Sequence, residues 1–385
     1  MRRILGLSVS LYSLLSIGIA AGAQTAGVQT AADRIRPIST ITAGVHAKHD
    51  TLAHELLNDE AASSTVTKSM YDFLDALIDA ALKRIPKKSR YGRDDALSAV
   101  KAIDDILTSM NVVYPAADTG MGMVDQLSDG LRGRAMNRAE IGALIAEPHN
   151  RRRIDHIRRH ATEKFYVNDC DTTAFLYLAV AEILGLPLSM IDLPGHNFIR
   201  YEEDGEQFNW ETLDAALEPD DFYRAQWRIP DALVAGRVYL APMSRIDVIG
   251  YHFTITAAVW AKKHQDRRML DDDEKAATLY PRGPRVWNQW AWNLVTASDP
   301  GLRDGKAATL YAARAVAISR TPNFLDTLAC AQAATGDFDL ALDTEQQAAK
   351  LAQTKDFPLD IAVPDFDGQI KRFHDRQNCA DRLTP

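Results

Sequence analysis

One stretch of the chain, residues 167–212, holds a cysteine, a histidine and a glutamate, each beside the expected end of a helix or strand. Cys170 precedes an apolar segment, His196 follows a turn, and Glu211 belongs to a later strand. A thiolate is a strong nucleophile, an imidazole can take the thiol proton, and a carboxylate can orient that imidazole. Two other interpretations stay open: a Cys/His/Glu metal site, and ordinary packed side chains.

The segment after the cysteine is expected to be a helix over residues 171–184. Its apolar residues recur at helical spacing, and a glycine and a proline follow in the order typical of a helix end. Cys170 would lie in the first turn, where unpaired N–H groups and the helix dipole favour a thiolate and can bind an oxyanion. Asp169 and Asp171 act in the opposite direction, because neighbouring negative charges raise the pKa of a thiol.

A β-hairpin is expected to carry the histidine and the glutamate. Segments 196–203 and 206–212 flank Asp204-Gly205, a dipeptide strongly typical of a two-residue hairpin turn. A further strand is expected over residues 188–192. Because side chains alternate along a strand, the turn also fixes which of them share a face of the sheet.

In that register, His196 and Glu211 are diagonal neighbours on one face, close enough for the carboxylate to orient the imidazole. Asn209 lies on the same face but further from His196, so it ranks second as a supporting residue. Asn168 and Tyr166 precede the cysteine closely in sequence and are further candidates as side-chain donors to an oxyanion.

A helix-borne cysteine, then a histidine after a strand turn, then an acid on the next strand resembles the transglutaminase-like thiol fold. The likeness covers roughly residues 150–240 and is carried by Cys170, by LPGHNFIRY with His196 and by FNWET with Glu211. It implies a Cys-bearing helix packed on an antiparallel sheet. Cys170 is then the nucleophile, His196 the general base and later acid, and Glu211 the orienting residue. The family more often has Asp where Glu211 stands, and its animal enzymes have Trp directly after the cysteine, where this chain has Asp171.

Helical segments repeat after about residue 246. PRVWNQWAWNLVTA begins at Pro284 and PNFLDTLACAQAAT begins at Pro322. The second unit resembles a tetratricopeptide repeat, which places two large and three small residues at set positions. These residues are Leu325, Leu328, Ala329, Ala341 and Ala348. Such repeats stack into surfaces that bind peptides, so we expect a protein partner there; a plain helical bundle is the alternative.

The expected fold class is therefore α+β, with a helical lead-in before the transglutaminase-like core and an all-α, tetratricopeptide-like domain after it. Lead-in helices are expected over 67–84, 93–112 and 137–146. The expected parts are a signal peptide (1–23), a flexible leader (24–66), a helical lead-in (67–149), the core (150–243), helical repeats (246–356) and a C-terminal tail (357–385).

The N-terminus is typical of a secretory signal. Two arginines precede an apolar run from Ile4 to Ala21, and Ala21-Gly22-Ala23 fits a cleavage site. An uncleaved membrane anchor is the alternative. We therefore expect an exported protein, and the family likeness suggests the bacterial periplasm.

Three cysteines are present, which leaves at least one thiol free or paired between molecules in an exported protein. A Cys330–Cys379 bridge would leave Cys170 free, and the sequence alone does not decide this. Five arginines in residues 150–160 form either a solvated helix face or a positive rim for an anionic substrate.

The chain carries 44 Lys and Arg against 52 Asp and Glu, a formal net charge of −8, which is a poor match to nucleic acid or an anionic membrane. There is no glycine-rich phosphate loop, and the other histidines form no ligand-spaced set, so no cofactor and no metal are expected. The expected partners are a peptide or protein substrate and a protein bound by the repeats.

Two functions follow. One is exported thiol-dependent acyl chemistry by a cysteine protease or amidase, or by a transglutaminase-like acyltransferase, with hydrolysis favoured over cross-linking. The other is an inactive transglutaminase-like scaffold whose repeats bind a partner. The complete histidine–glutamate hairpin favours the enzyme, and the Asp-Cys-Asp context favours the scaffold.

Overall fold

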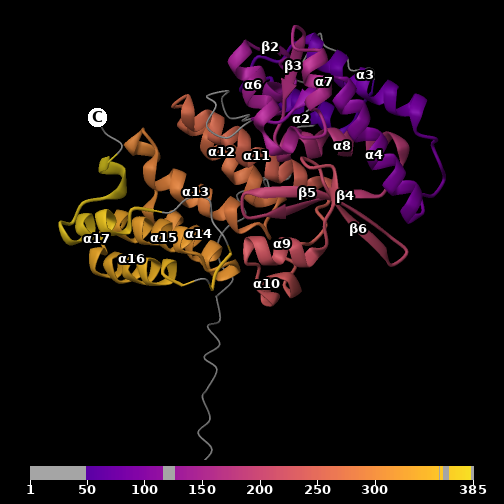
Figure 1. Ribbon diagram of the computed structural model, residues 1–385. Helices are drawn as coiled ribbons and strands as arrows, with labels where there is room; N and C mark the ends of the chain where they lie inside the picture. The colour runs from indigo at the N-terminus through magenta and orange to yellow at the C-terminus, as the bar shows by residue number, and fades with distance from the viewer. Residues whose placement is uncertain (1–48, 116–125, 355, 359–363, 383–385) are drawn as a thin grey trace, which may run out of the picture. The chain divides into compact units, whose positions relative to one another are not determined.

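A computed structural model describes residues 49–115, 126–354, 356–358 and 364–382 (Figure 1). The expected signal peptide and most of the expected leader lie outside the described residues. The described part is mixed α/β, with many helices around a three-stranded sheet and a four-stranded sheet. None of the helices described is long and apolar enough to cross a membrane.

The expected lead-in helices are confirmed, with small shifts at their ends. They are α3 (Lys68–Arg84), α4 (Arg93–Ser109) and α6 (Arg138–Ala146). The flexible leader expected over residues 24–66 ends earlier than predicted, because residues Leu52–Glu60 of that range form a further helix, α2. Leu56 and Leu57 of this helix are fully buried, so packing on the core stabilises a helix too short to form alone.

The lead-in and the start of the core also contain strands that the sequence did not predict. A small sheet has the order β1-β3-β2, made of β1 (Val112–Val113), β2 (Arg134–Ala135) and β3 (Lys164–Val167). Short helices α5 (Leu127–Gly130) and α7 (Ile154–Arg159) lie between these strands in the chain. β3 is the strand that leads directly into the cysteine-bearing helix.

That helix is α8 (Cys170–Leu184), nearly as predicted. Asp169 caps it, because its side chain accepts from the Thr172 N–H at 3.0 Å while the Thr172 hydroxyl faces back to the Asp169 N–H at 2.9 Å. Gly185 ends the helix in the left-handed conformation, which glycine adopts at little cost. The cap fixes Cys170 as the first helical residue.

The four-stranded sheet is an antiparallel meander in the order β4-β5-β6-β7. Its strands are β4 (Leu188–Leu193), β5 (His196–Glu203), β6 (Glu206–Glu211) and β7 (Ala216–Leu217). The predicted hairpin register is confirmed: Arg200 pairs with Asn209, and Ile199 pairs with Trp210. Asp204 and Gly205 both have positive φ, as the two-residue turn requires.

The two faces of this sheet are covered by different helices (Figure 1). On one face, Trp210 packs on α8 and its indole N–H donates to the Tyr177 hydroxyl at 3.0 Å. On the other, Phe198 packs under α9 (Asp220–Trp227), and residues of α10 (Asp231–Ala235) border the same cluster. The cysteine helix and α9 therefore cover opposite faces of the strands that carry His196 and Glu211.

The C-terminal part is helical, as predicted, and consecutive helices pack in pairs (Figure 1). The helices are α11 (Arg245–Lys262), α12 (Asp266–Leu279), α13 (Pro284–Thr296), α14 (Gly305–Ile318), α15 (Pro322–Ala334) and α16 (Phe338–Ala352). Ala329, Ala341 and Ala348 are fully buried, which fits their expected role as small residues between close helices. The finer tetratricopeptide arrangement, like the transglutaminase-like one, stays a prediction.

The expected C-terminal tail carries a further helix, α17 (Phe366–His374). A disulfide joins Cys330 of α15 to Cys379 after α17, so the possibility left open by the sequence is realised and Cys170 is free. The Gln369 amide contacts both bridged sulfurs, at 3.1 and 2.9 Å. The segment from α17 to Cys379 is therefore held against α15.

One cluster of buried apolar residues runs through the expected lead-in, core and repeats. It extends from Leu52 in α2, through α8 and the four-stranded sheet, to Phe324 in α15. A second cluster joins the helices from α13 to α16 to the segment around α17, and includes Cys330 and Phe373. The segments that we distinguished in sequence thus share one hydrophobic core.

Candidate active site

Cys170 begins α8 and is half-buried. Its thiol donates to the Asp171 carboxylate at 3.7 Å, a weak hydrogen bond that points the hydrogen toward an acid. Burial raises the pKa of the Cys170 thiol well above its ordinary value, and the charges of Asp171 and Asp169 raise it further. The backbone N–H of Asn197 faces the sulfur and lowers the pKa, but this effect is smaller. In the free protein the thiol is therefore neutral near pH 7.

Asp171 is held by groups from two other elements. It accepts from the Asn197 amide on β5 and from the Tyr251 hydroxyl on α11, the latter at 2.8 Å. Burial and then the charge of Asp171 raise the pKa of Asp169 to about 7. The carboxylates that flank the cysteine are thus a fixed part of the site, and the sequence anticipated the direction of their effect.

His196 and Glu211 come together as the hairpin predicts. The imidazole Nε2–H donates to Glu211 Oε2 at 2.8 Å, and both side chains are largely buried. The Tyr223 hydroxyl donates to the same carboxylate oxygen at 3.3 Å. Because a carboxylate can only accept, these bonds place the imidazole proton on Nε2 and leave Nδ1 as an acceptor.

Aromatic rings cover this pair from α9. The indole of Trp227 stacks on the imidazole with ring centres 4.9 Å apart and an interplanar angle of 14°. Tyr223 stacks on Phe198, the next residue on the same face of β5, at 3.9 Å. These rings limit the access of water to the hydrogen bond between His196 and Glu211. Sequence reasoning missed them; the signal was the amphipathic segment DDFYRAQW that follows β7.

The observed link between Cys170 and the His196–Glu211 pair is a backbone N–H of β5. The Asn197 N–H that faces the sulfur belongs to the residue next to His196. Among the hydrogen bonds of the described residues, none joins Cys170 Sγ to the His196 ring. The structure therefore forms the histidine–glutamate pair, places the thiol at the start of the same strand, and leaves the thiol–imidazole contact unmade.

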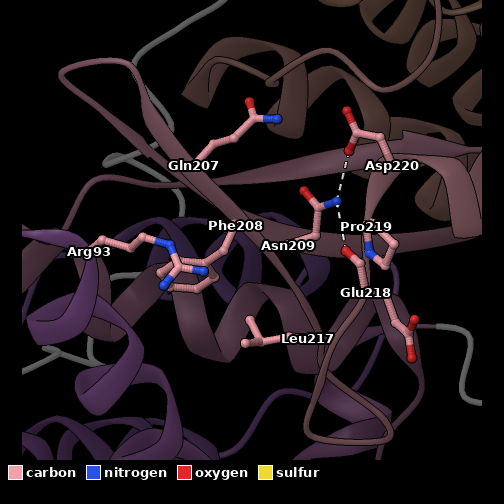
Figure 2. A pocket seen from close by; sticks show the side chains of 8 residues that line it. All are labelled: Arg93, Gln207, Phe208, Asn209, Leu217, Glu218, Pro219 and Asp220. Carbon is pink, nitrogen blue, oxygen red and sulfur yellow. Dashed lines mark hydrogen bonds between the residues drawn. The ribbon is translucent and has the colours of Figure 1, made fainter.

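Asn209, which ranked second as a residue supporting His196, forms its hydrogen bonds with other residues. Its amide donates to Asp220 at 2.7 Å and to the Glu218 carbonyl at 3.0 Å, as Figure 2 shows. Its oxygen accepts from Arg200 Nε at 2.7 Å. Asn209 lines a separate pocket of about 410 Å³, bordered by Arg93 and Phe208 (Figure 2), and these three hydrogen bonds do not involve His196. Its role is to brace the hairpin against the start of α9.

Asn168 and Tyr166 also have other partners. The Asn168 amide donates to the carbonyl oxygens of Gly130 and Tyr166, at 3.1 and 3.3 Å, so it has no hydrogen left for an oxyanion. The Tyr166 ring packs on Phe73 with ring centres 4.4 Å apart. Neither contact involves the thiol. The free N–H groups beside the sulfur belong instead to the backbone at the start of α8.

The basic segment 150–160 is not a uniformly solvated face. Arg153 is 1% exposed and forms an ion pair with the buried Asp104. In the described part of the chain, no group of three or more His, Cys, Asp or Glu is arranged to hold a metal ion. The zinc interpretation of Cys170, His196 and Glu211 thus gains no support from the geometry.

No family model matches this sequence, and no curated protein matches it either. An assignment of function therefore depends on the site itself.

Proposed function

We propose that this protein is a thiol-dependent acyl-chemistry enzyme that hydrolyses a peptide or side-chain amide. Cys170 is the nucleophile, His196 the general base and then acid, and Glu211 the residue that orients and stabilises the imidazolium. The observation that carries the proposal is the 2.8 Å bond between Glu211 and His196 Nε2, which leaves Nδ1 free to accept a proton.

The neutral resting thiol sets the order of steps. As the S–H bond breaks, its proton moves to His196 Nδ1 and the sulfur bonds to the amide carbon. The unpaired backbone N–H groups at the start of α8 are placed to donate to the oxyanion. The C–N bond then breaks, and the imidazolium returns the proton to the leaving amine. Water, deprotonated by His196, finally hydrolyses the thioester.

The thiol–imidazole contact must form during this reaction. The thiol hydrogen now points to Asp171, so a bound substrate has to turn the Cys170 side chain toward His196. Apo sites often show long or misaligned catalytic hydrogen bonds that tighten on binding. Hydrolysis is favoured over cross-linking because, among the described residues around the site, no feature marks a pocket for an acceptor amine.

The disulfide supports the proposed export. Bridges persist in oxidising compartments such as the periplasm, and Cys330–Cys379 is such a bridge. The paired helices α11–α16 remain the proposed surface for a protein partner. The proposed export and the proposed binding of a protein partner would both stand even if Cys170 were unreactive.

A second candidate function is an inactive scaffold. It is favoured by one observation: burial and two carboxylates hold the pKa of Cys170 high, whereas a reactive cysteine usually has a lowered pKa. In this case the hairpin is structural and the helical repeats carry the function.

The test is labelling by a peptide acyloxymethyl ketone, which reacts with a cysteine that has a working histidine partner. We expect labelling of wild type, none of Cys170→Ala and strongly reduced labelling of His196→Ala. His149→Ala is the matched control, because that partly exposed histidine pairs with Asp214 outside the site. Labelling that is equal in wild type and His196→Ala would refute the enzyme and favour the scaffold.

A further inference from the structure

A small cavity lies where the sheet meets the repeats. It has a volume of about 110 Å³, and its walls come from the β4–β5 turn, the first two turns of α13, the start of α15, and the residues Tyr239 and Pro358. Pro194, Arg285, Asn288, Asn323 and Phe324 are among the lining residues. The turn that brings Pro194 to the cavity continues, two residues later, into His196. The cavity therefore opens beside one end of the candidate active site.

Arg285 is the only cation among the residues that line this cavity. Among the described residues it has no ion pair and no hydrogen bond; its contact is with the Tyr251 ring, whose centre is 6.0 Å from the guanidinium carbon. Asp171 and Asp192 are near enough to interact electrostatically, but neither lies within ion-pair distance. Arg285 is an exposed residue, so the five N–H donors of its guanidinium face water and are available to a ligand.

The location of Arg285 strengthens this point. It occupies the first turn of α13, which contains no acidic residue and whose N-cap, Gly283, offers no side chain. Arg285 is exposed, so water screens its charge, but a cation at the positive end of a helix dipole is still more stable when an anion accompanies it. The charge and the helix end together favour a carboxylate or a similar anion in the cavity.

Asn288 adds a second requirement. It lies one turn along α13, lines the same cavity, and its side-chain oxygen is buried without a hydrogen-bond partner. A buried acceptor without a donor is costly, so a ligand that supplies an N–H beside its carboxylate satisfies both side chains. Peptides have this combination. At roughly 30 Å³ per water, the cavity holds about four waters, enough for a carboxylate and a short stem.

The cavity is also connected to the thiol. Tyr251, which contacts Arg285, donates its hydroxyl to Asp171 at 2.8 Å, and Asp171 accepts from the Cys170 thiol. Pro194 joins the cavity to the histidine, and Tyr251 joins it to the cysteine. A peptide held with its amide at Cys170 has the neighbouring part of its chain within reach of Arg285.

We propose that this cavity binds a carboxylate of the peptide substrate, which Arg285 recognises by paired hydrogen bonds while Asn288 accepts from an adjacent N–H. That the ligand is the substrate of this protein rests on the proposed function. That the cavity binds a carboxylate does not require the protein to be catalytically active. The carboxylate belongs either to an acidic side chain or to the C-terminus of the peptide, and small probes distinguish these sources.

The experiment uses the full chain with Cys170→Ala, so that binding is measured without turnover. Saturation-transfer NMR titrations compare three probes: N-acetylglycine, which has an α-carboxylate; N-acetylglutamate α-amide, which has a side-chain carboxylate; and N-acetylglutamine α-amide, which has neither. We expect at least one carboxylate probe to bind and the neutral probe to bind at least tenfold more weakly. The probe that binds identifies the source, and binding of both supports a site for either.

Variants assign the binding to the cavity. Arg285→Gln should weaken carboxylate binding at least tenfold, and Asn288→Asp should weaken it by placing a negative charge beside the ligand. Arg267→Gln, at an exposed arginine on α12, should change nothing. If neither carboxylate probe binds, or if both cavity variants bind them as the parent does, the proposal is overturned. If the probes bind but no amide is hydrolysed, the cavity is real and the proposed catalysis has failed.

Discussion

Glu211→Gln tests the candidate active site most directly. The side chain keeps its shape but loses the charge that opposes the imidazolium, 2.8 Å from His196 Nε2 in a largely buried setting. A hydrogen bond between a charged and a polar group is worth roughly 1.5–3 kcal/mol. Since about 1.4 kcal/mol is a tenfold change in rate, the loss should be roughly 10- to 150-fold in kcat/KM.

A second effect of this change increases the loss. The glutamine amide can rotate and donate to Nε2, which moves the imidazole proton to Nδ1. The nitrogen that should accept the thiol proton then carries one of its own. We therefore take 10-fold as the lower bound and expect the larger part of the loss in kcat, because the imidazolium forms only during reaction.

The assay is hydrolysis of a fluorogenic peptide amide, together with the rate of labelling of Cys170. Glu206→Gln is the control, because it makes the same change at the exposed far end of β6. Circular dichroism melts establish that both variants are folded. Equal rates for Glu211→Gln and wild type, in two folded proteins, would refute the role assigned to this carboxylate.

Three further predictions concern charge and stability. Asp171→Asn should lower the pKa of Cys170, although burial, the larger cause, keeps it high; the pH profile of iodoacetamide alkylation measures this, and an unchanged profile contradicts it. Reduction of the Cys330–Cys379 bridge, whose cysteines are 49 residues apart, should cost about 4 kcal/mol in denaturant unfolding; no change on reduction contradicts this. Burial raises the pKa of Asp273 to about 7, against about 3.9 in an unfolded chain. The folded state thus binds this proton more tightly, and the free energy of unfolding should fall as pH rises from about 4 to 7. Asp273→Asn should flatten that fall, and an equal slope in both proteins contradicts the assignment.

The hairpin was predictable because its determinants are local. Asp204-Gly205 permits one tight turn, and the turn fixes which residues oppose each other. The pairing of His196 with Glu211 follows from that register without any knowledge of the rest of the fold. The start of α8 at Cys170 was predictable for a similar reason, because its cap and its terminal glycine are adjacent in sequence.

The remaining features depend on contacts between distant segments. Trp227 reaches His196 only because α9 folds back over the sheet. Arg153 is buried because Asp104, from α4, lies opposite it. The strands of the small sheet are two to four residues long, and β1 pairs with β3 across a long connection, so no periodic pattern marks them. Each feature reflects tertiary packing, which a linear pattern does not contain.

The shared hydrophobic core has a consequence for how this protein can be divided. Apolar side chains from α11, α13 and α15 belong to the cluster that also buries α8 and the sheet. A fragment that ends before residue 245 would expose the apolar surface that these helices cover, and would tend to aggregate. The segment that carries Cys170 is therefore not expected to fold when it is moved into another protein. Expression and domain exchange should keep the helices up to α15 together with the sheet and α8.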